Sequence, residues 1–377
     1  MNITVSKNEL LSKLKLVGKI IQPNKTNPEL DNFLFKIDSD KLSVTGADEQ
    51  GSITTTIECT IDPEGGTLNQ FTANAKTLLD ALKELSEQPL TFKLSVKDMY
   101  VEITAQYING KFEIVGGKGD LFPTVNPTGD PLQIPMSSMQ FTHGLKRTYF
   151  RAADDELRPV MNGVYIDQQE EVLTFVGSDG STLAMMEYIS NNQNRCSFIL
   201  PSKIAKILVD IIPADEDNFS IHVFSKHVQF VHSGFTILYR MIEGKYPNYR
   251  SVIPSSNNLI CRGSKLDVIA ALKRVSIFCN RNTSLLKVTL FNNKMMLAAQ
   301  DLDYSISADE EIPVEYTSEK VSIGFKATFL LDILSNLPYD EFTLHIADPS
   351  RAALIKGAEQ SDSENLTYLI MPLMLNY

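Results

Sequence analysis

Three adjacent acidic residues are the first candidates for chemistry in this sequence. Asp154, Asp155 and Glu156 could act as paired acids in a hydrolysis reaction or supply oxygen ligands to a magnesium ion. Either role needs further groups, and no partner histidine lies within sequence reach. We therefore interpret the stretch as a loop that follows a basic helix. A nuclease or hydrolase remains an alternative, and it predicts an activity that is lost when Asp154 and Asp155 are replaced by Ala.

The histidines and a glycine-rich stretch do not form a recognisable site either. His222, His227 and His232 are spaced by five residues, and an odd step along a strand places side chains on opposite faces. These histidines are therefore not expected to share a metal ion. The stretch GGKGD at 116–120 lacks the pattern of a phosphate-binding loop and is typical of a turn. The sequence thus predicts no catalytic centre, cofactor or metal site.

Length and composition predict a globular protein with more than one domain. The chain has 377 residues, of which 43% are hydrophobic and 21% charged, and this length predicts two or three domains. No apolar run reaches the roughly 18–20 residues of a membrane span, and the N-terminal MNITVSKNELL lacks the pattern of a signal peptide. The cysteines form no CxxC pair, which predicts a reducing, cytoplasmic location. They are Cys59, Cys196, Cys261 and Cys279.

Six amphipathic segments recur at regular intervals. In the first segment, Leu10, Leu14 and Val17 follow the spacing of one helix face. Asn74 is a candidate N-cap for the second segment, and Pro201 marks the start of the fourth. Corresponding segments begin 125 to 130 residues apart. The predicted helices span 7–21, 74–86, 137–153, 201–212, 264–280 and 326–337.

Matching hairpins separate the two helices of each interval. Each hairpin reads as a strand, a polar turn, a second strand and an aspartate, at 33–48, 163–179 and 287–301. We therefore predict an α+β fold of three repeated domains, each with two helices and about eight short strands in antiparallel sheets. The turn-rich stretches NPTGDP and IPSSNN give the boundaries. The predicted domains are 1–128, 129–254 and 255–377.

Formal charge is distributed unevenly between the helices and the rest of the chain. The net charge is −11, which by itself speaks against nucleic-acid binding. The six helical segments together carry +9, however, and this leaves −20 on the remainder. If these helices line one surface, that surface attracts a polyanion while the outside repels it. The helices contain few aromatic residues and no sequence-reading motif, so we expect contacts with the phosphate backbone alone.

Four stretches of the sequence resemble the bacterial sliding clamp, the β subunit of DNA polymerase III. They are RPVMNGVYID, VGSDGSTLA, GKYPNYRSVIP and the terminal YLIMPLML. The similarity covers the whole length, and GKYPNYRSVIP and MPL are its most specific parts. It implies the DNA clamp fold, a head-to-tail homodimeric ring of six like domains, with helices facing the hole for duplex DNA and sheets outside. It also implies a processivity factor that is not an enzyme.

The resemblance accounts for the apolar C-terminal stretch LIMPLMLNY. In sliding clamps, the last strand borders a groove between the second and third domains. Peptides of polymerases, the clamp loader and repair proteins dock there through motifs with Gln and Leu or Phe anchors. Leu369 and Ile370 are expected to alternate between the faces of this strand. The resemblance assigns to the groove Met161, Ser178, Gly180, Thr182, Leu183, Pro247, Val252, Ala352, Ile370, Met371, Pro372 and Leu373.

The chain departs from the family pattern beside this groove. Where the family usually has Thr-Asp-Gly-His-Arg-Leu, this sequence has SDGSTL at 178–183. Met374 stands where the family often has Arg, and Asn376 and Tyr377 are additional. The loss of these polar donors predicts a more apolar partner motif or different affinities. A peptide-docking scaffold that never encircles DNA remains an alternative, and a stable monomer would favour it.

The resemblance also assigns residues to DNA contacts and to the ring seam. Sliding clamps contact DNA phosphates from their inner helices and from nearby loops. For DNA we predict Lys25, Lys146, Arg147, Arg151, Lys203, Lys206, Lys273 and Arg274. For the seam we predict Phe112, Ile277 and Phe278, and we expect Phe278 to be an anchor that the dimer buries.

Overall fold

The computed structural model describes residues 1–62, 68–134, 136–192, 194–213 and 219–375. Contacts divide the chain into two compact units. Unit 1 comprises Met1–Met139 and Asp210–Met241, and unit 2 comprises Gln140–Val209 and Ile242–Tyr377. The middle third of the chain therefore contributes strands to both units.

The described residues contain six α-helices, one at each predicted position. Asn74 caps the second helix as predicted, because its Oδ1 accepts a hydrogen bond from the amide of Thr77 at 3.0 Å. Ser6 and Ser264 cap the first and fifth helices in the same way. Pro201 is the last residue of a strand, one residue before the helix. The helices are α1 Lys7–Val17, α2 Ala75–Lys83, α3 Ser138–Thr148, α4 Ser202–Ile211, α5 Lys265–Val275 and α6 Ala327–Asn336.

The predicted helices 137–153 and 264–280 are too long, because each α-helix gives way to a 3₁₀ turn. After α3, Thr148 leaves the helical region with φ −126°, and its hydroxyl donates to the carbonyl of Gly144 at 2.7 Å. The 3₁₀ turns are η1 Pro28–Asp31, η2 Tyr149–Arg151, η3 Pro159–Met161, η4 Tyr249–Val252 and η5 Ser276–Phe278.

Unit 1 contains two antiparallel sheets. Sheet A has five strands in the order β5-β1-β7-β8-β9, and sheet B has eight in the order β10-β15-β16-β17-β4-β3-β2-β6. Their bounds are β1 Asn2–Ser6, β2 Asn32–Asp38, β3 Lys41–Ala47, β4 Gly51–Glu58, β5 Thr60–Asp62, β6 Gln70–Asn74, β7 Pro89–Val96, β8 Val101–Tyr107, β9 Gly110–Gly116, β10 Leu132–Ile134, β15 Phe219–Val223, β16 His227–His232 and β17 Phe235–Arg240.

Unit 2 has the same organisation. Sheet C has eight strands in the order β14-β11-β12-β13-β25-β24-β23-β18, and sheet D has four in the order β21-β20-β19-β22. Their bounds are β11 Gly163–Gln168, β12 Val172–Ser178, β13 Thr182–Ile189, β14 Cys196–Pro201, β18 Leu259–Ser264, β19 Leu285–Phe291, β20 Lys294–Asp301, β21 Ile306–Pro313, β22 Val321–Lys326, β23 Glu341–Ile346, β24 Ala353–Gly357 and β25 Glu364–Ile370.

Two strand pairs join consecutive repeats inside these sheets. β4 of the first repeat pairs with β17 of the second, with Gly51 opposite Tyr239. β13 of the second repeat pairs with β25 of the third, with Thr182 opposite Ile370. The predicted hairpins are present as β2–β3, β11–β12 and β19–β20. The predicted α+β fold of three repeats is therefore confirmed.

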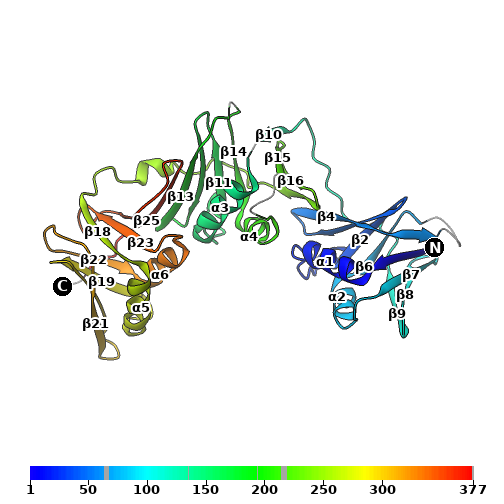
Figure 1. The fold of residues 1–377 in the computed structure, drawn as a ribbon, viewed down its shortest axis with the longest axis horizontal. Coiled ribbons are helices and arrows are strands. Elements are labelled where there is room, and N and C mark those ends of the chain that lie inside the picture. The colour runs from blue at the N-terminus through cyan, green and yellow to red at the C-terminus, as the bar shows by residue number, and fades with distance from the viewer. Residues whose placement is uncertain (63–67, 135, 193, 214–218, 376–377) are drawn as a thin grey trace. The chain divides into compact units, whose positions relative to one another are not determined.

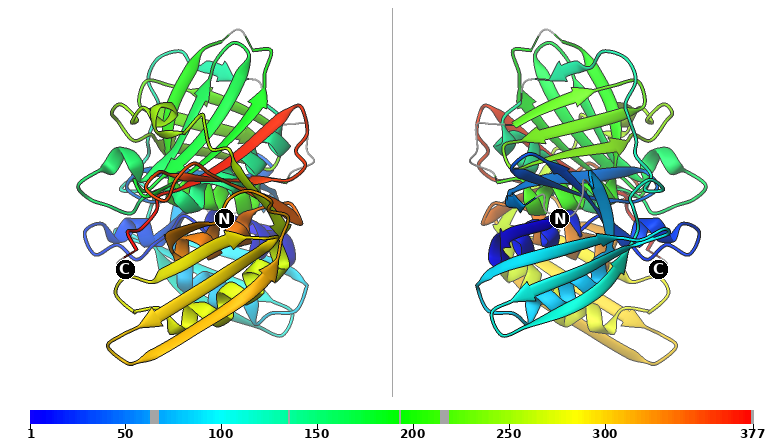
Figure 2. Two further views of the ribbon diagram at one scale, coloured as in Figure 1. Left: turned by 90° about the vertical axis from the view of Figure 1, so that its left-hand side faces the viewer. Right: turned by 90° about the vertical axis from the view of Figure 1, so that its right-hand side faces the viewer.

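Helices cover sheet faces within each unit. In unit 1, α1 and α2 pack on each other and on strands of sheet B (Figure 1). In unit 2, α5 packs on β20 and β21, and α6 packs on β22 and β25. The two side views show sheet D in yellow and orange and the β7–β9 strands of sheet A in cyan (Figure 2). Fully buried side chains such as Leu14 and Phe33 in unit 1, and Leu286 and Ile333 in unit 2, fill the cores.

Candidate functional site

A pocket of about 300 Å³ lies in unit 2, beside the pairing of β13 with β25. Strand side chains form its floor, and the turn between β12 and β13 forms its rim. The segment that follows β17 forms a wall. Apolar surface dominates, with a few polar groups at the edge, as in many ligand sites. The lining residues are Arg158, Met161, Ser178, Gly180, Ser181, Thr182, Leu183, Tyr246, Pro247, Asn248, Tyr249, Val252, Leu369 and Met371.

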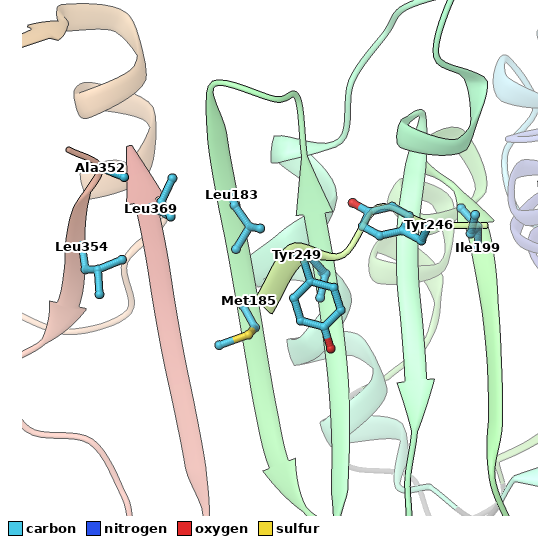
Figure 3. Packing of buried hydrophobic residues seen from close by; sticks show 9 residues of the cluster. Leu183, Met185, Ile199, Tyr246, Tyr249, Ala352, Leu354 and Leu369 are labelled. Atoms are coloured by element: carbon cyan, nitrogen blue, oxygen red, sulfur yellow. The ribbon is translucent and has the colours of Figure 1, made fainter. Parts of the chain in front are cut away.

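The pocket floor is built from strand residues that face the same side of sheet C. Leu183 on β13 lies opposite Leu369 on β25, and Leu369 lies opposite Leu354 on β24. All three are buried, and they lie in one row of side chains (Figure 3). Side chains alternate along a strand, so Met371 has the same facing as Leu369, and Ile370 has the opposite one.

An aromatic wall packs over this sheet face. Tyr246 stacks on Tyr165 of β11 with ring centroids 4.8 Å apart, and Tyr249 meets the same ring edge-on at 6.1 Å (Figure 3 labels Tyr246 and Tyr249). Burial raises the pKa of Tyr246 above its ordinary value, so its phenol keeps its proton where a free tyrosine would ionise. Arg250 lies over the ring of Tyr249 and pairs with Glu187 at 2.9 Å. These contacts fix the segment on the sheet.

The rim turn is held together by one carboxylate. Asp179 Oδ1 accepts hydrogen bonds from the amides of Ser181 at 2.8 Å and Thr182 at 2.6 Å. Its Oδ2 accepts a hydrogen bond from the Thr182 hydroxyl at 2.9 Å. Gly180 has φ 88°, a conformation that favours glycine. Arg158 crosses the turn and donates to the Asp179 carbonyl at 3.3 Å, so the rim combines a fixed backbone with a guanidinium.

Eight of the twelve predicted groove residues line this pocket. They are Met161, Ser178, Gly180, Thr182, Leu183, Pro247, Val252 and Met371. The other four do not line it. Ala352 is buried in the apolar cluster beneath the wall, and Ile370 faces away because of strand alternation. Pro372 and Leu373 lie beyond the end of β25 and outside the lining.

Sequence reasoning missed six lining residues. All six belong to stretches that already carried the resemblance, so the missing information was which way their side chains face within those stretches. They are Arg158, Ser181, Tyr246, Asn248, Tyr249 and Leu369. The additional Asn376 and Tyr377 lie outside the described residues.

The apolar C-terminus runs from sheet C to sheet D. After β25 ends at Ile370, the amide of Met371 donates to the Ser181 carbonyl at 2.9 Å. The amide of Leu373 then donates to the carbonyl of Gly324 on β22 at 2.8 Å. A Cβ at Gly324 would lie 2.5 Å from the Leu373 carbonyl oxygen, so this close approach requires glycine. The segment after β25 is thus tied to both sheets by its backbone and leaves Met371, 45% exposed, at the pocket.

Four of the predicted DNA-contacting lysines are exposed. Lys146, Lys206 and Lys273 project from α3, α4 and α5, and Lys25 precedes η1. Across the described ranges, no carboxylate lies within ion-pair distance of these four lysines. Lys203 on α4 is half-buried. The exposed lysines are free to meet a ligand from solution.

The predicted DNA-contacting arginines are engaged within unit 2. Arg274 forms a two-point ion pair with Glu310 of β21, with Nε 2.9 Å from Oε2. Arg147 donates to the final backbone carbonyl of α6 at 3.1 Å. Arg151 is only 8% exposed, and its Nη2 lies 3.4 Å from Asp332 Oδ2. A buried guanidinium cannot reach a phosphate, so the structure gives no support to the prediction for Arg151, and we exclude this residue from the DNA surface.

The predicted seam residues lie next to strands at sheet edges. Phe112 is half-buried on β9, the edge strand of sheet A. Ile277 and Phe278 belong to η5, which packs on β20 and β21 at the edge of sheet D. Ile277 is 73% exposed, whereas Phe278 is half-buried. Ile277 is therefore the more exposed apolar side chain of the two.

Of the acidic residues 154–156, Asp155 is held by its neighbours in the loop. The side-chain hydrogen bond from Arg158, at 2.8 Å, and the amide of Leu157 lower the pKa of Asp155. Within the ranges that the structure describes, no group of three His, Cys, Asp or Glu side chains is arranged to hold a metal ion. No described helix is both long and apolar enough to cross a membrane.

Three family models match successive parts of the chain. They describe the N-terminal, central and C-terminal domains of the DNA polymerase III beta subunit, and they match residues 1–125, 135–248 and 250–374. The beta sliding clamp of Pseudomonas putida is 25% identical over 377 residues and covers 100% of both chains. That of Haemophilus influenzae is 24% identical over 376 residues with the same coverage.

Solved structures agree with the matches in sequence. The DNA polymerase III subunit beta of Pseudomonas aeruginosa has a TM-score of 0.90 at 25% identity, with 100% of both chains covered. A sliding clamp of the same species bound to griselimycin has a TM-score of 0.89 at 24% identity, again with full coverage. The matched domains follow one another in the order of the three repeats. The chain therefore belongs to the DNA polymerase III beta subunit family, the beta sliding clamps.

Proposed function

We propose that two copies of this chain close head to tail into a ring around duplex DNA and tether DNA polymerase through the pocket. The curated relatives are beta sliding clamps, and the family models are those of a polymerase subunit. The ring acts by topology: DNA cannot leave a closed ring sideways, so weak contacts suffice for long retention. No chemical step is required of the protein, and the family is one of processivity factors.

One observation carries the ring proposal, namely the strand count of the four sheets. Sheets B and C have eight strands because each joins two consecutive repeats, whereas sheets A and D have only five and four. The joins use equivalent strands, β4 with β17 and β13 with β25. Among the strands that the structure describes, the equivalent ones without such a partner are β21 and β9, both at sheet edges. Pairing β21 of one copy with β9 of the other would repeat the same join.

The repeat also gives the expected register of this seam. In the join of β13 with β25, the first residue of β13 lies opposite the last residue of β25. In the join of β4 with β17, Gly51 lies opposite Tyr239, one residue before the end of β17. We take the register of the β13–β25 join, which places Ile306 of β21 opposite Gly116 of the second copy, and Glu310 opposite Phe112. Ile306 and Ile277 are exposed in the single chain, as is Val115 on β9. Open strand edges flanked by exposed apolar side chains favour association.

The exposed lysines suit contact with the DNA backbone. Lys146, Lys206 and Lys273 lie on helices of unit 2, and Lys25 lies near η1 of unit 1. Ammonium groups bind phosphates as mobile point charges and read no sequence, which allows sliding. We propose that these four lysines, with Lys203, face the DNA and that the acidic strands face outward.

The pocket suits a short apolar peptide. Its floor of Leu183 and Leu369 can receive Leu or Phe anchors, and Met161 and Met371 can adapt to different ones. Griselimycin is bound to related clamps from two genera. We propose that peptide motifs of polymerase, clamp-loader and repair proteins dock here, and that griselimycin competes with them.

A cross-link across the seam tests the ring. The expected register places Ser307 opposite Val115 of the second copy, so oxidation of S307C/V115C should give a disulfide-linked dimer. The variant S307C/K111C is the matched control, because its cysteines would be about 13 Å apart along the strand. Equal cross-linking of both variants, or none at all, would contradict the proposed seam and favour a docking scaffold that does not encircle DNA.

A further inference from the structure

We propose that Arg151 is a positioning residue for the pocket, because its buried guanidinium holds the turn that forms the pocket rim. Sequence reasoning assigned this arginine to DNA, but its burial excludes that role. The inference rests on the proposed peptide-binding role of the pocket. It gives a role to an arginine that does not itself line the pocket.

The guanidinium is the start of a chain of polar contacts that ends in the rim. Arg151 Nη1 donates to Thr182 Oγ1 at 3.3 Å, and this hydroxyl donates its own proton to Asp179 Oδ2 at 2.9 Å. The same Nη1 lies 3.9 Å from Asp179 Oδ2, which adds a charge interaction. The other oxygen of Asp179 holds the amides of the turn. Arg151 thus compensates the negative charge on which the turn depends.

The opposite side of the guanidinium reaches the third repeat. Arg151 Nη2 lies 3.4 Å from Asp332 Oδ2 on α6. The guanidinium carbon also lies 5.1 Å from the ring centre of Phe150 and 5.4 Å from that of Phe329. These contacts lock the side chain, so its hydrogen bond to the rim starts from a fixed point. Burying a guanidinium is unfavourable unless it is paired, and here two carboxylates pair it.

The other two repeats do without a charge at this position. The position thirteen residues after the first residue of the helix is Ile20 for α1, Arg151 for α3 and Phe278 for α5. Ile20 is fully buried in unit 1. An apolar side chain therefore satisfies the fold, and among the three repeats the arginine occurs in the one whose rim turn lines the pocket. This contrast indicates a role in the site rather than a general need of the fold.

Replacement of Arg151 by the residue of the first repeat tests the proposal. We expect R151I to weaken binding of a fluorescein-labelled pentapeptide, with Gln first and Leu-Phe last, by about tenfold, because it leaves the half-buried Asp179 carboxylate without its cation. Amide hydrogen exchange at Ser181 and Thr182 should become faster, since their acceptor is less well held. R151K, which keeps the charge, should recover part of the affinity. D332N removes the ion pair with α6 but leaves the hydrogen bond from Arg151 to Thr182, so it should lose less affinity than R151I.

Each result decides the proposal. An R151I protein with unchanged affinity and unchanged exchange at the rim would overturn it, and so would an effect of D332N equal to that of R151I. If R151I does not fold, the pentapeptide affinity of R151K and its amide exchange at the rim decide the proposal instead. If the wild-type chain does not bind the peptide, the proposed function of the pocket fails, and hydrogen exchange alone then tests the positioning role.

Discussion

Leu183 and Leu369 lie directly opposite each other across the pairing of β13 with β25. One belongs to the second repeat and the other to the third, and both are buried in the floor of the pocket. The floor therefore exists only because these two repeats share a sheet. The pairing of β13 with β25 therefore both links the second repeat to the third and forms the floor of the pocket.

Met371 should contribute to peptide binding without contributing much to stability. It lines the pocket and is 45% exposed, so M371A removes an apolar surface that the ligand would touch but leaves the buried floor in place. We expect about a tenfold rise in the Kd of the labelled pentapeptide and a nearly unchanged melting temperature. Fluorescence anisotropy and thermal unfolding measure the two quantities.

Met374 provides the matched control for that experiment. It is 80% exposed, lies three residues further along the same tail and does not line the pocket. M374A should bind the peptide like wild type. Equal losses of affinity in the two variants would mean that the tail acts as a whole and not through the side chain of Met371.

A charge at Ile277 should disrupt the seam. This side chain is 73% exposed in the single chain and lies beside the open edge of sheet D. Because a two-copy ring contains the seam twice, I277D should raise the dimer dissociation constant by about 100-fold or more. Sedimentation equilibrium measures the constant. Ile189 is 62% exposed on β13, away from both edges, so I189D should remain as dimeric as wild type.

Reversal of two helix lysines should weaken DNA retention selectively. K146E/K206E places carboxylates where we expect phosphates, so binding should weaken. In a plot of the logarithm of the DNA-binding constant against the logarithm of the salt concentration, the magnitude of the slope should fall by about 0.9 for each phosphate that is no longer neutralised. The affinity for the pentapeptide should not change.

K93E on β7, a strand of sheet A, is the control. It also reverses the charge of a lysine, and it should weaken DNA binding far less per substituted lysine. If K93E had the same effect, net charge rather than a DNA-facing surface would explain binding.

The thiol of Cys261 should make stability depend on alkaline pH. Burial raises its pKa to about 12 from 9.0, so the folded chain keeps the thiol protonated where the unfolded chain ionises it. Its contribution is present below pH 9 and is lost as the pH rises from 9 towards 12. Between about pH 8 and pH 10, wild type should lose about 1 kcal/mol of unfolding free energy relative to C261A. Urea unfolding at the two pH values measures the difference. An equal change in unfolding free energy for wild type and C261A would contradict the prediction.

The elements of the fold were predictable because they depend on local periodicity. Asn74 has the side chain of an N-cap, and the apolar spacing of Leu10 and Leu14 is that of a helix face. The sharing of sheets was not predictable, because the pairing of Thr182 with Ile370 depends on residues far apart in sequence. The end of α3 was also missed, since its boundary depends on the backbone of Thr148.

The sequence predicted the segments that form the site, but not which of their side chains face the pocket. Ile370 and Met371 are neighbours in one motif, yet only Met371 lines the pocket, because a strand alternates its side chains. Arg151 looked like a DNA ligand because it belongs to a basic segment. Only the tertiary structure brings Thr182 and Asp332 to its guanidinium. The cytoplasmic location and the domain boundaries stay predictions.

The most direct test of the central claim uses topology. S307C/V115C protein is oxidised in the presence of a nicked circular plasmid, and the mixture is then washed in about 1 M salt, which screens charge contacts, on a sizing column. Enclosure predicts protein that stays with the circle through the wash and leaves once the plasmid is linearised by a restriction enzyme. Protein that washes off the circle, or that stays equally on linear DNA, would contradict the account.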